Sequence, residues 1–109
     1  MINSLSLNDN GDSTWGVGYQ SSDAIGGFQF TIEGASVISA DGGDADTNGF
    51  TMSLGSGNAV IGFSLPGASI PAGAGTLLTL ELDGTPSRLV SLVISGEAGA
   101  SLDFTFGGF

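Results

Sequence analysis

The sequence lacks cysteine and histidine, two residue types on which many active sites and metal sites depend. Without cysteine, the chain forms neither a disulfide framework nor a thiolate zinc site. Without histidine, it has no Ser-His-Asp triad and lacks both the commonest general base and the commonest transition-metal ligand. With no lysine either, the Ser, Thr and Asp side chains have no neighbour that would activate a nucleophile. Nothing places two carboxylates across a pocket for glycoside cleavage, so we predict that the protein is not an enzyme.

Positive charge is nearly absent. Arg88 is the only basic residue against eleven acidic ones, and the formal net charge at pH 7 is -10. Such a chain repels nucleic-acid phosphates and anionic lipid surfaces, so we expect no nucleic acid and no membrane among its partners. No stretch approaches the roughly 18 consecutive apolar residues of a membrane-spanning helix. The composition favours cations, basic protein surfaces or neutral sugars as partners.

The first residues, MINSLSLNDNGD, contain neither the basic segment nor the apolar segment of a secretory signal peptide. If Met1 is the native start, we expect the chain to be made and kept in the cytoplasm until something else releases it.

Glycine is abundant, at 20 residues, but apolar residues make up 40% of the chain and alternate with polar ones. This period of two predicts strands rather than helices or disorder. We expect about nine strands, at residues 4–7, 15–19, 25–32, 35–39, 50–54, 58–65, 76–82, 89–95 and 101–106. Turns every 8–12 residues are typical of a β-sandwich. The predicted fold class is therefore all-β, with residues 1–109 forming one β-sandwich domain.

Four segments carry more specific expectations. The run between Pro66 and Gly75 contains prolines and glycines that end one strand and delay the next, so it is predicted to carry the chain from one sheet to the other. The segment 89–95 is apolar on both faces and is expected to be a central strand. In 58–65 the apolar face is assigned to Ile61, Phe63 and Leu65, and residues 40–49 are expected to form a polar loop.

The order of these segments resembles a known module. AIGGFQFTIEGASVISADGGD, then GFTMSL, AVIGFSL and IPAGAGTLLTLELDG, are similar in order and spacing to the cohesin-type β-sandwich over residues 24–95. The chain also resembles modules of marine and cyanobacterial phage structural proteins and of bacterial surface proteins. The resemblance implies a jelly-roll-like sandwich that holds a partner. The chain is shorter than cellulosomal cohesins and has no attached modules, so we carry over neither dockerin binding nor any binding residue.

Two acidic segments are candidate calcium sites. Asp41, Asp44 and Asp46 cluster in DGGDAD, where three carboxylates and backbone carbonyls offer the oxygen ligands that calcium prefers. The alternative is a solvated polar loop. In NDNGDS, residues 8–13, the side-chain oxygens alternate as in a calcium loop, but Tyr19 stands where the bidentate Glu is needed. We interpret that segment as an Asn-Gly hairpin turn.

Five residues are candidates for an interface. Trp15 and Tyr19 share one face of a strand, where they form core, contact a protein or stack on a sugar ring. Arg88 is expected to pair with Asp83 or Asp103, or to face a partner's acidic surface. The aromatic end FTFGGF, with Phe106 and Phe109, either completes the sandwich or docks on a partner subunit.

A virion protein fits both a sandwich of extracellular type and the lack of an export signal, because virions assemble in the host cytoplasm and leave by lysis. The leading hypothesis is a phage capsid decoration protein, or a tail-associated module. It would contact the major capsid protein or other virion proteins through hydrophobic and β-edge contacts, and it would oligomerise. The alternative is a cohesin-like or carbohydrate-binding adhesion module of a larger cell-surface protein. No cofactor is expected, apart from possible calcium.

Overall fold

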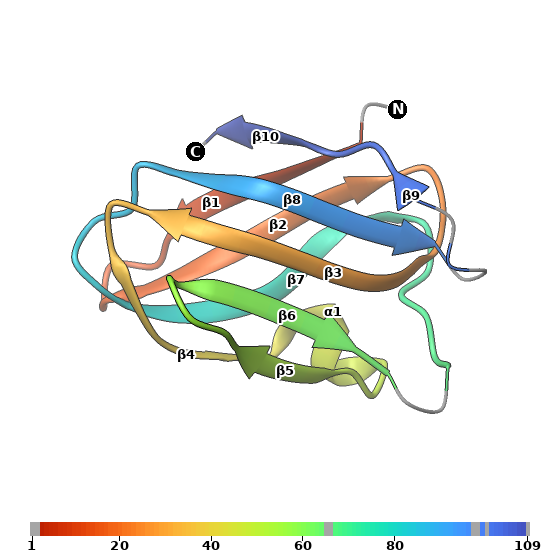
Figure 1. The fold of residues 1–109 in the computed structure, drawn as a ribbon, viewed down its shortest axis with the longest axis horizontal. Coiled ribbons are helices and arrows are strands. Elements are labelled where there is room, and N and C mark those ends of the chain that lie inside the picture. Colours follow the sequence, from red (N-terminus) through yellow and green to blue (C-terminus); the bar gives the residue numbers. More distant parts are fainter. Residues whose placement is uncertain (1–2, 65–66, 97–98, 100, 109) are drawn as a thin grey trace.

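A computed structural model of the chain describes residues 3–64, 67–96, 99 and 101–108. These residues form two five-stranded β-sheets packed face to face and one short helix (Figure 1). We name each sheet after its central strand. The β2 sheet has the order β10 (Thr105–Gly108), β1 (Ser4–Asp9), β2 (Thr14–Ser21), β7 (Gly73–Asp83), β4 (Ser36–Asp41). The β3 sheet has the order β5 (Thr51–Leu54), β6 (Ala59–Phe63), β3 (Ile25–Glu33), β8 (Arg88–Gly96), β9 (Ser101–Leu102).

The alternating sequence pattern builds the core between the two sheets. In β3, Phe28, Phe30 and Ile32 are buried, while Gln29 between them is exposed. On the opposite sheet, β7 buries Leu78 and its alternating neighbours in the same way. Because successive side chains of a strand point to opposite faces, each strand contributes one apolar row to the core. The expected all-β sandwich is confirmed.

The proline- and glycine-rich connection joins the two sheets, as predicted. The strand before it, β6, belongs to the β3 sheet, and the strand after it, β7, belongs to the β2 sheet. Within the connection Ile70 is fully buried and exchanges two backbone hydrogen bonds of 2.8 Å with Ile25. Pro66 lies outside the described residues. The break in the pattern therefore serves to move the chain across the sandwich.

Three sequence expectations were wrong in detail. The loop 40–49 contains a helix, α1 (Gly43–Thr47), which buries Ala45 against the core. The apolar strand β8 is not central, since its only neighbour beyond β3 is the two-residue β9, and Val93 is 59% exposed. The segment 101–106 is not one strand, because β9 pairs in the β3 sheet and β10 pairs parallel to β1 in the β2 sheet.

The expected inward face of β6 was also wrong, by one residue. Gly62 pairs with the buried Phe28 and Val60 pairs with Phe30, so Gly62 and Val60 face the core. Ile61 then points outward, opposite Gln29. A shift of one residue exchanges the two faces of a strand. The sequence misleads here because the inner face carries a glycine where an apolar side chain is expected.

The glycine at position 62 makes room for an aromatic stack. The Phe28 ring lies over Gly62 and stacks on Phe30 and Phe50, with centroid distances of 6.1 and 6.0 Å. A Cβ at position 62 would overlap the Phe28 ring. We expect Gly62→Ala to lower the free energy of unfolding by about 1–3 kcal/mol, because an overpacked core must shift its side chains.

Urea denaturation measures this effect, and Gly16→Ala is the matched control. Gly16 also lies in a strand, but a Cβ there would meet no atom closer than 3.9 Å. The control variant is expected to be unchanged or more stable by up to about 1 kcal/mol. Equal losses in the two variants would contradict the aromatic stack as the cause.

Candidate interaction surface

The outward face of the β3 sheet differs in composition from the strands of the other sheet. Residues directly opposite each other in antiparallel strands share a face, so the pairing of β6, β3 and β8 defines it. Gln29 pairs with Ile61 on one side and with Val93 on the other, and Thr31 pairs with Val90. We call this surface the β3 face; its side chains are those of Gln29, Thr31, Ala59, Ile61, Phe63, Val90, Val93, Ser95 and the ion pair Glu33–Arg88.

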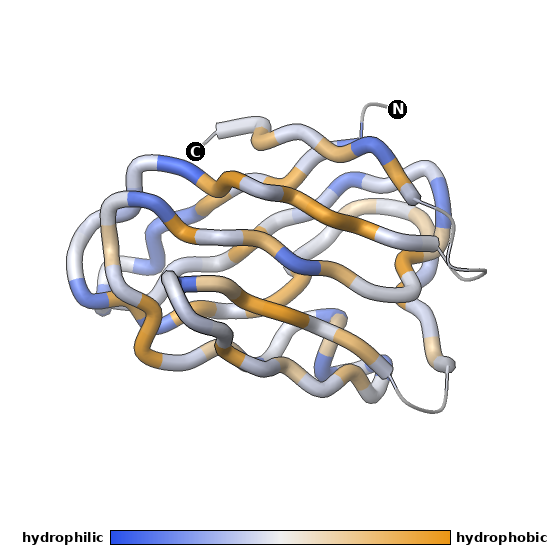
Figure 2. The backbone as a smooth tube through the Cα atoms, in the orientation of Figure 1, coloured by the Kyte–Doolittle hydropathy of each residue, from blue (hydrophilic) through white to orange (hydrophobic). Residues whose placement is uncertain are grey.

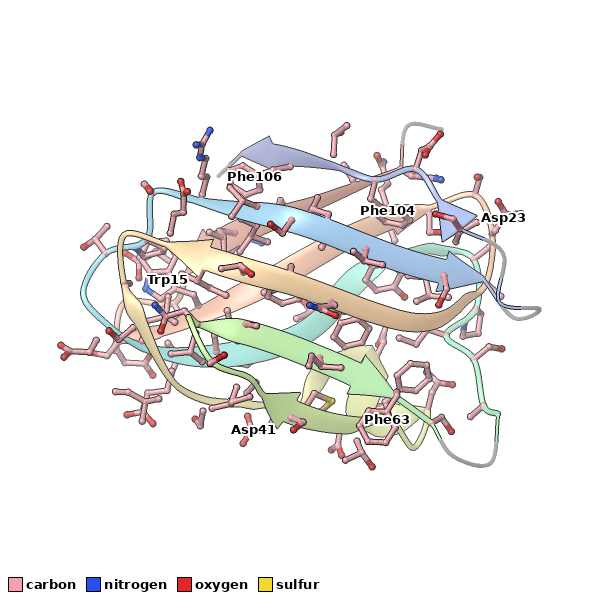
Figure 3. All side chains as sticks on the ribbon, in the orientation of Figure 1. Trp15, Asp23, Asp41, Phe63, Phe104 and Phe106 are labelled. Carbon is pink, nitrogen blue, oxygen red and sulfur yellow. The ribbon has the colours of Figure 1, made fainter. Side chains whose placement is uncertain are left out.

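Apolar side chains on the β3 face are accessible. Val93 is 59% exposed and Phe63 is 37% exposed, while Ile61 and Val90 are half-buried. Figure 3 shows Phe63 at the end of β6, away from the core. In Figure 2 the tube along β6 and β8 is mostly orange or pale. The face therefore offers hydrophobic contact on regular strands rather than on loops.

Charge is distributed unequally between the two sheets. The described strands of the β3 sheet carry only Glu33 and Arg88, whose charges cancel. The strands of the β2 sheet carry four acidic residues and no basic one; they are Asp9, Asp41, Glu81 and Asp83. In a chain of net charge -10, the β3 face is thus a surface without net charge on an acidic molecule.

The single arginine closes one end of the β3 face. Arg88 Nε donates a hydrogen bond of 2.6 Å to Glu33 Oε1, because β8 places Arg88 directly opposite Glu33. The expected pairing with Asp83 or Asp103 was wrong. Both side chains are exposed, at 60% and 44%, so the pair contributes little to stability, about 0–1 kcal/mol. Its main effect is to leave this end of the face without net charge.

Bulges interrupt the strands at or near two of the sheet edges. Near the free edge of the β3 sheet, β8 has a bulge opposite Phe30, where Ser91 adopts a φ of 55°. At the edge of the β2 sheet, β4 has a bulge around Ile38, which is 53% exposed. Bulges twist an edge and oppose the addition of a further strand. The geometry therefore disfavours strand addition at these two places, and the predicted β-edge contacts stay a prediction.

The predicted aromatic pair lies in the core. Trp15 is 8% exposed and Tyr19 is 7% exposed, and both belong to the buried cluster. Figure 3 shows Trp15 at one end of the sandwich. They point inward because Leu5 and Leu80, which are fully buried, are their strand partners in β1 and β7. In this structure neither ring forms a platform on which a sugar or a partner protein would stack.

The Tyr19 hydroxyl anchors the helix α1. Its Oη donates a hydrogen bond of 2.5 Å to Asp44 Oδ2. A Cβ on Gly75, beside it in β7, would come within 2.8 Å of the same carboxylate oxygen. The absence of a side chain at Gly75 therefore leaves room for the Asp44 carboxylate to reach the buried tyrosine. This hydrogen bond holds α1 against the sandwich.

This arrangement separates the three predicted calcium ligands. Asp41 closes β4, Asp44 turns toward Tyr19, and Asp46 lies exposed on α1. Within the described residues, no three acidic side chains gather closely enough to hold one metal ion. The joint site expected for Asp41, Asp44 and Asp46 is not formed, because the helix directs Asp44 toward the core. Calcium binding itself stays a prediction.

The state of Tyr19 is directly measurable, because the chain has one tyrosine. Burial, followed by the hydrogen bond to Asp44 and the charge of that carboxylate, raises the pKa of Tyr19 to about 12. The pKa of tyrosine in an unfolded chain is about 10. The contribution of this group to stability is therefore complete below pH 10 and is lost as the pH rises through 12.

We expect tyrosinate absorbance in an alkaline titration of the folded protein to have its midpoint near pH 12. In Asp44→Asn the midpoint is expected to fall but to stay above the unfolded value, because burial still acts on the hydroxyl. A native midpoint equal to the unfolded one would contradict the burial of Tyr19, and equal midpoints in the original protein and in Asp44→Asn would show that Tyr19 and Asp44 are not joined in solution.

The segment NDNGDS forms the β1–β2 hairpin turn, in agreement with the interpretation from sequence. Gly11 has a φ of 85°, and Asn10 N donates to Thr14 O at 3.0 Å. The carboxylates turn back on the loop: Asp9 Oδ1 accepts from Gly11 N, and Asp12 Oδ1 accepts from Thr14 N and Oγ1. The two hydrogen bonds from Thr14 hold the pKa of Asp12 below its usual value, and the bond from the Thr14 hydroxyl is the main cause.

The aromatic C-terminal segment belongs to the sandwich. Phe106 in β10 pairs with Leu5 of β1, and its half-buried ring packs against the core, as does that of Phe104 farther along the sandwich (Figure 3). Phe109 lies outside the described residues. The described part of this segment is therefore a strand of the chain's own β2 sheet.

The comparisons with solved structures agree with this architecture. The chain is similar to a non-cellulosomal cohesin from the hyperthermophilic archaeon Archaeoglobus fulgidus, with a TM-score of 0.70, 14% identity, and coverage of 97% of this chain and 86% of the archaeal one. The fold is the cohesin-type β-sandwich. A chain in the crystal structure of the CaDoc0917–CaCohA2 complex at pH 5.5 is also similar, with a TM-score of 0.64 and 16% identity over 98% and 96% of the two chains. No family model and no curated protein matches the sequence.

The pairing of β6, β3 and β8 brings together on one face residues that were not selected from the sequence. None of Ile61, Phe63, Val90 and Val93 was predicted to lie in an interface. The available signal was the second apolar row of β8, because a strand with apolar residues on both faces is either central or carries an exposed apolar face. The exposure of Val93, at 59%, shows that β8 carries an exposed apolar face.

Among the described residues, no helix has the length and hydropathy of a membrane-spanning segment.

Proposed function

We propose that the protein is a non-enzymatic binding module that holds a partner protein against the β3 face. The observation that carries the proposal is that the β3 face has exposed apolar side chains and no net charge on a molecule of net charge -10. Interface cores are depleted of charged residues because a charge that is buried without a partner loses its hydration. The β3 face satisfies that requirement over three adjacent strands, and the fold neighbour in the CaDoc0917–CaCohA2 complex was crystallised with a partner.

The surrounding charge defines the chemistry of the partner. The partner should present an apolar centre to Val93 and Ile61, and neutral or basic residues around it. The acidic field of the protein would attract such a partner at long range and repel acidic ones. Attraction of this kind acts mainly on the association rate and weakens with salt, whereas apolar contact with the face sets the dissociation rate.

A protein partner is favoured over a sugar. The two rings for which sugar stacking was one alternative, Trp15 and Tyr19, are buried, and Phe63 is the one aromatic ring among the described residues of the β3 face. The virion location, the capsid partner and the formation of homo-oligomers stay predictions, as does the alternative location at a cell surface. Each is compatible with a module that acts by binding.

The test is affinity capture from an extract of the source culture on immobilised protein. One portion of the extract is digested with protease and another with a mixture of glycosidases before the capture. A protein partner is lost after protease and retained after glycosidases, and it is eluted by purified protein in solution. Loss after glycosidases alone would assign the binding to a sugar and overturn the proposal.

A further inference from the structure

The chain contains two Asn-Gly pairs, Asn10–Gly11 and Asn48–Gly49, in very different settings. In such a pair the amide nitrogen of glycine can attack the side-chain carbonyl of asparagine, since glycine has no Cβ to hinder the approach. We propose that Asn10 is a site of spontaneous covalent modification in the folded protein and that Asn48 is protected by the fold. This inference is independent of the proposed binding function.

Asn10 lies in the β1–β2 turn, exposed to water together with both of its neighbours in the chain. Its side-chain Nδ2 donates one hydrogen bond, 3.1 Å long, to Thr14 Oγ1 at the surface. The nitrogen of Gly11 donates to Asp9 Oδ1 at 2.8 Å. That distance lies within the range over which a carboxylate acts as a general base, so Asp9 is placed to take the proton as the nitrogen attacks.

The reaction balances with water as its only co-reactant. Gly11 N forms a bond to Asn10 Cγ while its proton moves to the Asp9 carboxylate. The bond from Cγ to Nδ2 then breaks, and Nδ2 takes up a proton and leaves as ammonia, so that a five-membered cyclic imide remains. Water opens the imide at either carbonyl and yields aspartate or isoaspartate. The product has one more negative charge than the original chain and no Nδ2 to donate to Thr14.

Asn48 has the same chemistry but is fixed at the C-terminal end of α1. Its Nδ2 donates to Asp44 O at 2.7 Å, and its backbone nitrogen donates to the same oxygen at 3.0 Å. The nitrogen of Gly49 donates to a backbone carbonyl, Asp46 O, at 3.0 Å. The next residue, Phe50, is buried and donates its N–H to Ala45 O at 2.9 Å. Bringing Gly49 N to the Asn48 side chain therefore requires local unfolding of α1.

The experiment incubates the purified full chain at neutral pH and physiological temperature and follows acidic charge variants by ion exchange. Mass spectrometry with electron-transfer fragmentation then locates aspartate and isoaspartate. We expect modification at Asn10 to be faster than at Asn48 by about tenfold or more, the factor that corresponds to 1.4 kcal/mol. In concentrated urea the two pairs are expected to react at similar rates, which assigns the difference to the fold.

Two variants test the parts of the inference separately. Asn10→Gln should abolish the main acidic variant, and Asp9→Asn should slow modification at Asn10 several-fold while the hairpin is retained. Similar rates at Asn10 and Asn48 in the folded protein, or faster modification at Asn48, would overturn the assigned site. An unchanged or faster rate in Asp9→Asn would overturn the role of the Asp9 carboxylate.

Discussion

Val93→Asp is expected to weaken partner binding by about thirtyfold or more, which corresponds to the roughly 2 kcal/mol that define an interface hot spot. Val93 is the most exposed large apolar side chain of the β3 face. Docking would bury the new carboxylate among Gln29, Ile61 and the partner without a compensating charge, and such burial is costly. The free energy of unfolding should change by less than about 0.5 kcal/mol, since the side chain is largely in water.

Calorimetry or surface plasmon resonance with the captured partner measures this loss, and urea denaturation checks the fold. The matched control is Thr76→Asp, which adds the same charge in place of an exposed β-branched residue in β7 of the other sheet. The Thr76→Asp variant should bind the partner with an affinity within a few-fold of the original, because it changes only the long-range electrostatic field of the protein. A second variant, Val93→Thr, preserves shape and should bind with an intermediate affinity. Equal losses in Val93→Asp and Thr76→Asp would contradict docking on the β3 face.

Phe30→Ala is expected to lower the free energy of unfolding by about 3–5 kcal/mol. Phe30 is fully buried in β3 and stacks on Phe28, which stacks in turn on Phe50. Removing the ring loses its transfer free energy and leaves a cavity that strands held in hydrogen-bonded register fill only in part. Small domains are stable by only about 5–15 kcal/mol in total, so this variant should lose a large share of its stability.

Urea denaturation at constant pH measures the change, with Gln29→Ala as the control. Gln29 directly precedes Phe30 in the same strand, but its side chain is exposed on the opposite side of the sheet, the β3 face. Its removal should change stability by less than about 0.5 kcal/mol. If Phe30→Ala does not fold, Phe30→Leu provides the milder test, with a smaller loss of the same sign. A loss in Phe30→Leu no larger than that in Gln29→Ala would contradict the place of Phe30 in the core.

The sequence was sufficient for the fold because the alternation of apolar and polar residues is local information. It located the first eight strands, the β1–β2 turn and the crossover before β7, and the order of the segments indicated the cohesin-type sandwich. It misassigned β6 because Gly62 faces the core and two apolar residues, Ile61 and Phe63, face water. The register of β6 depends on the contact between Gly62 and Phe28, which are distant in the sequence.

The candidate site was predicted less well than the fold, for a physical reason. Trp15 and Tyr19 were selected as aromatic residues, but whether an aromatic residue is buried depends on which face of its strand meets the other sheet. Arg88 was expected to pair with acidic residues near it in sequence, whereas strand register brings it to Glu33. The helix α1 was missed because Gly, Asp and Thr favour turns; burial of Ala45 and the bond between Tyr19 and Asp44 stabilise it through tertiary contacts.

The most direct test of the account is site-specific photo-crosslinking with the partner-containing extract. A photoreactive amino acid is introduced at position 93 on the β3 face in one protein and at position 76 on the β2 sheet in another. The account predicts that position 93 yields one dominant crosslinked protein, competed away by unlabelled protein, and that position 76 does not. Crosslinking of that protein from position 76 and not from position 93 would show that the partner docks elsewhere and would contradict the central claim.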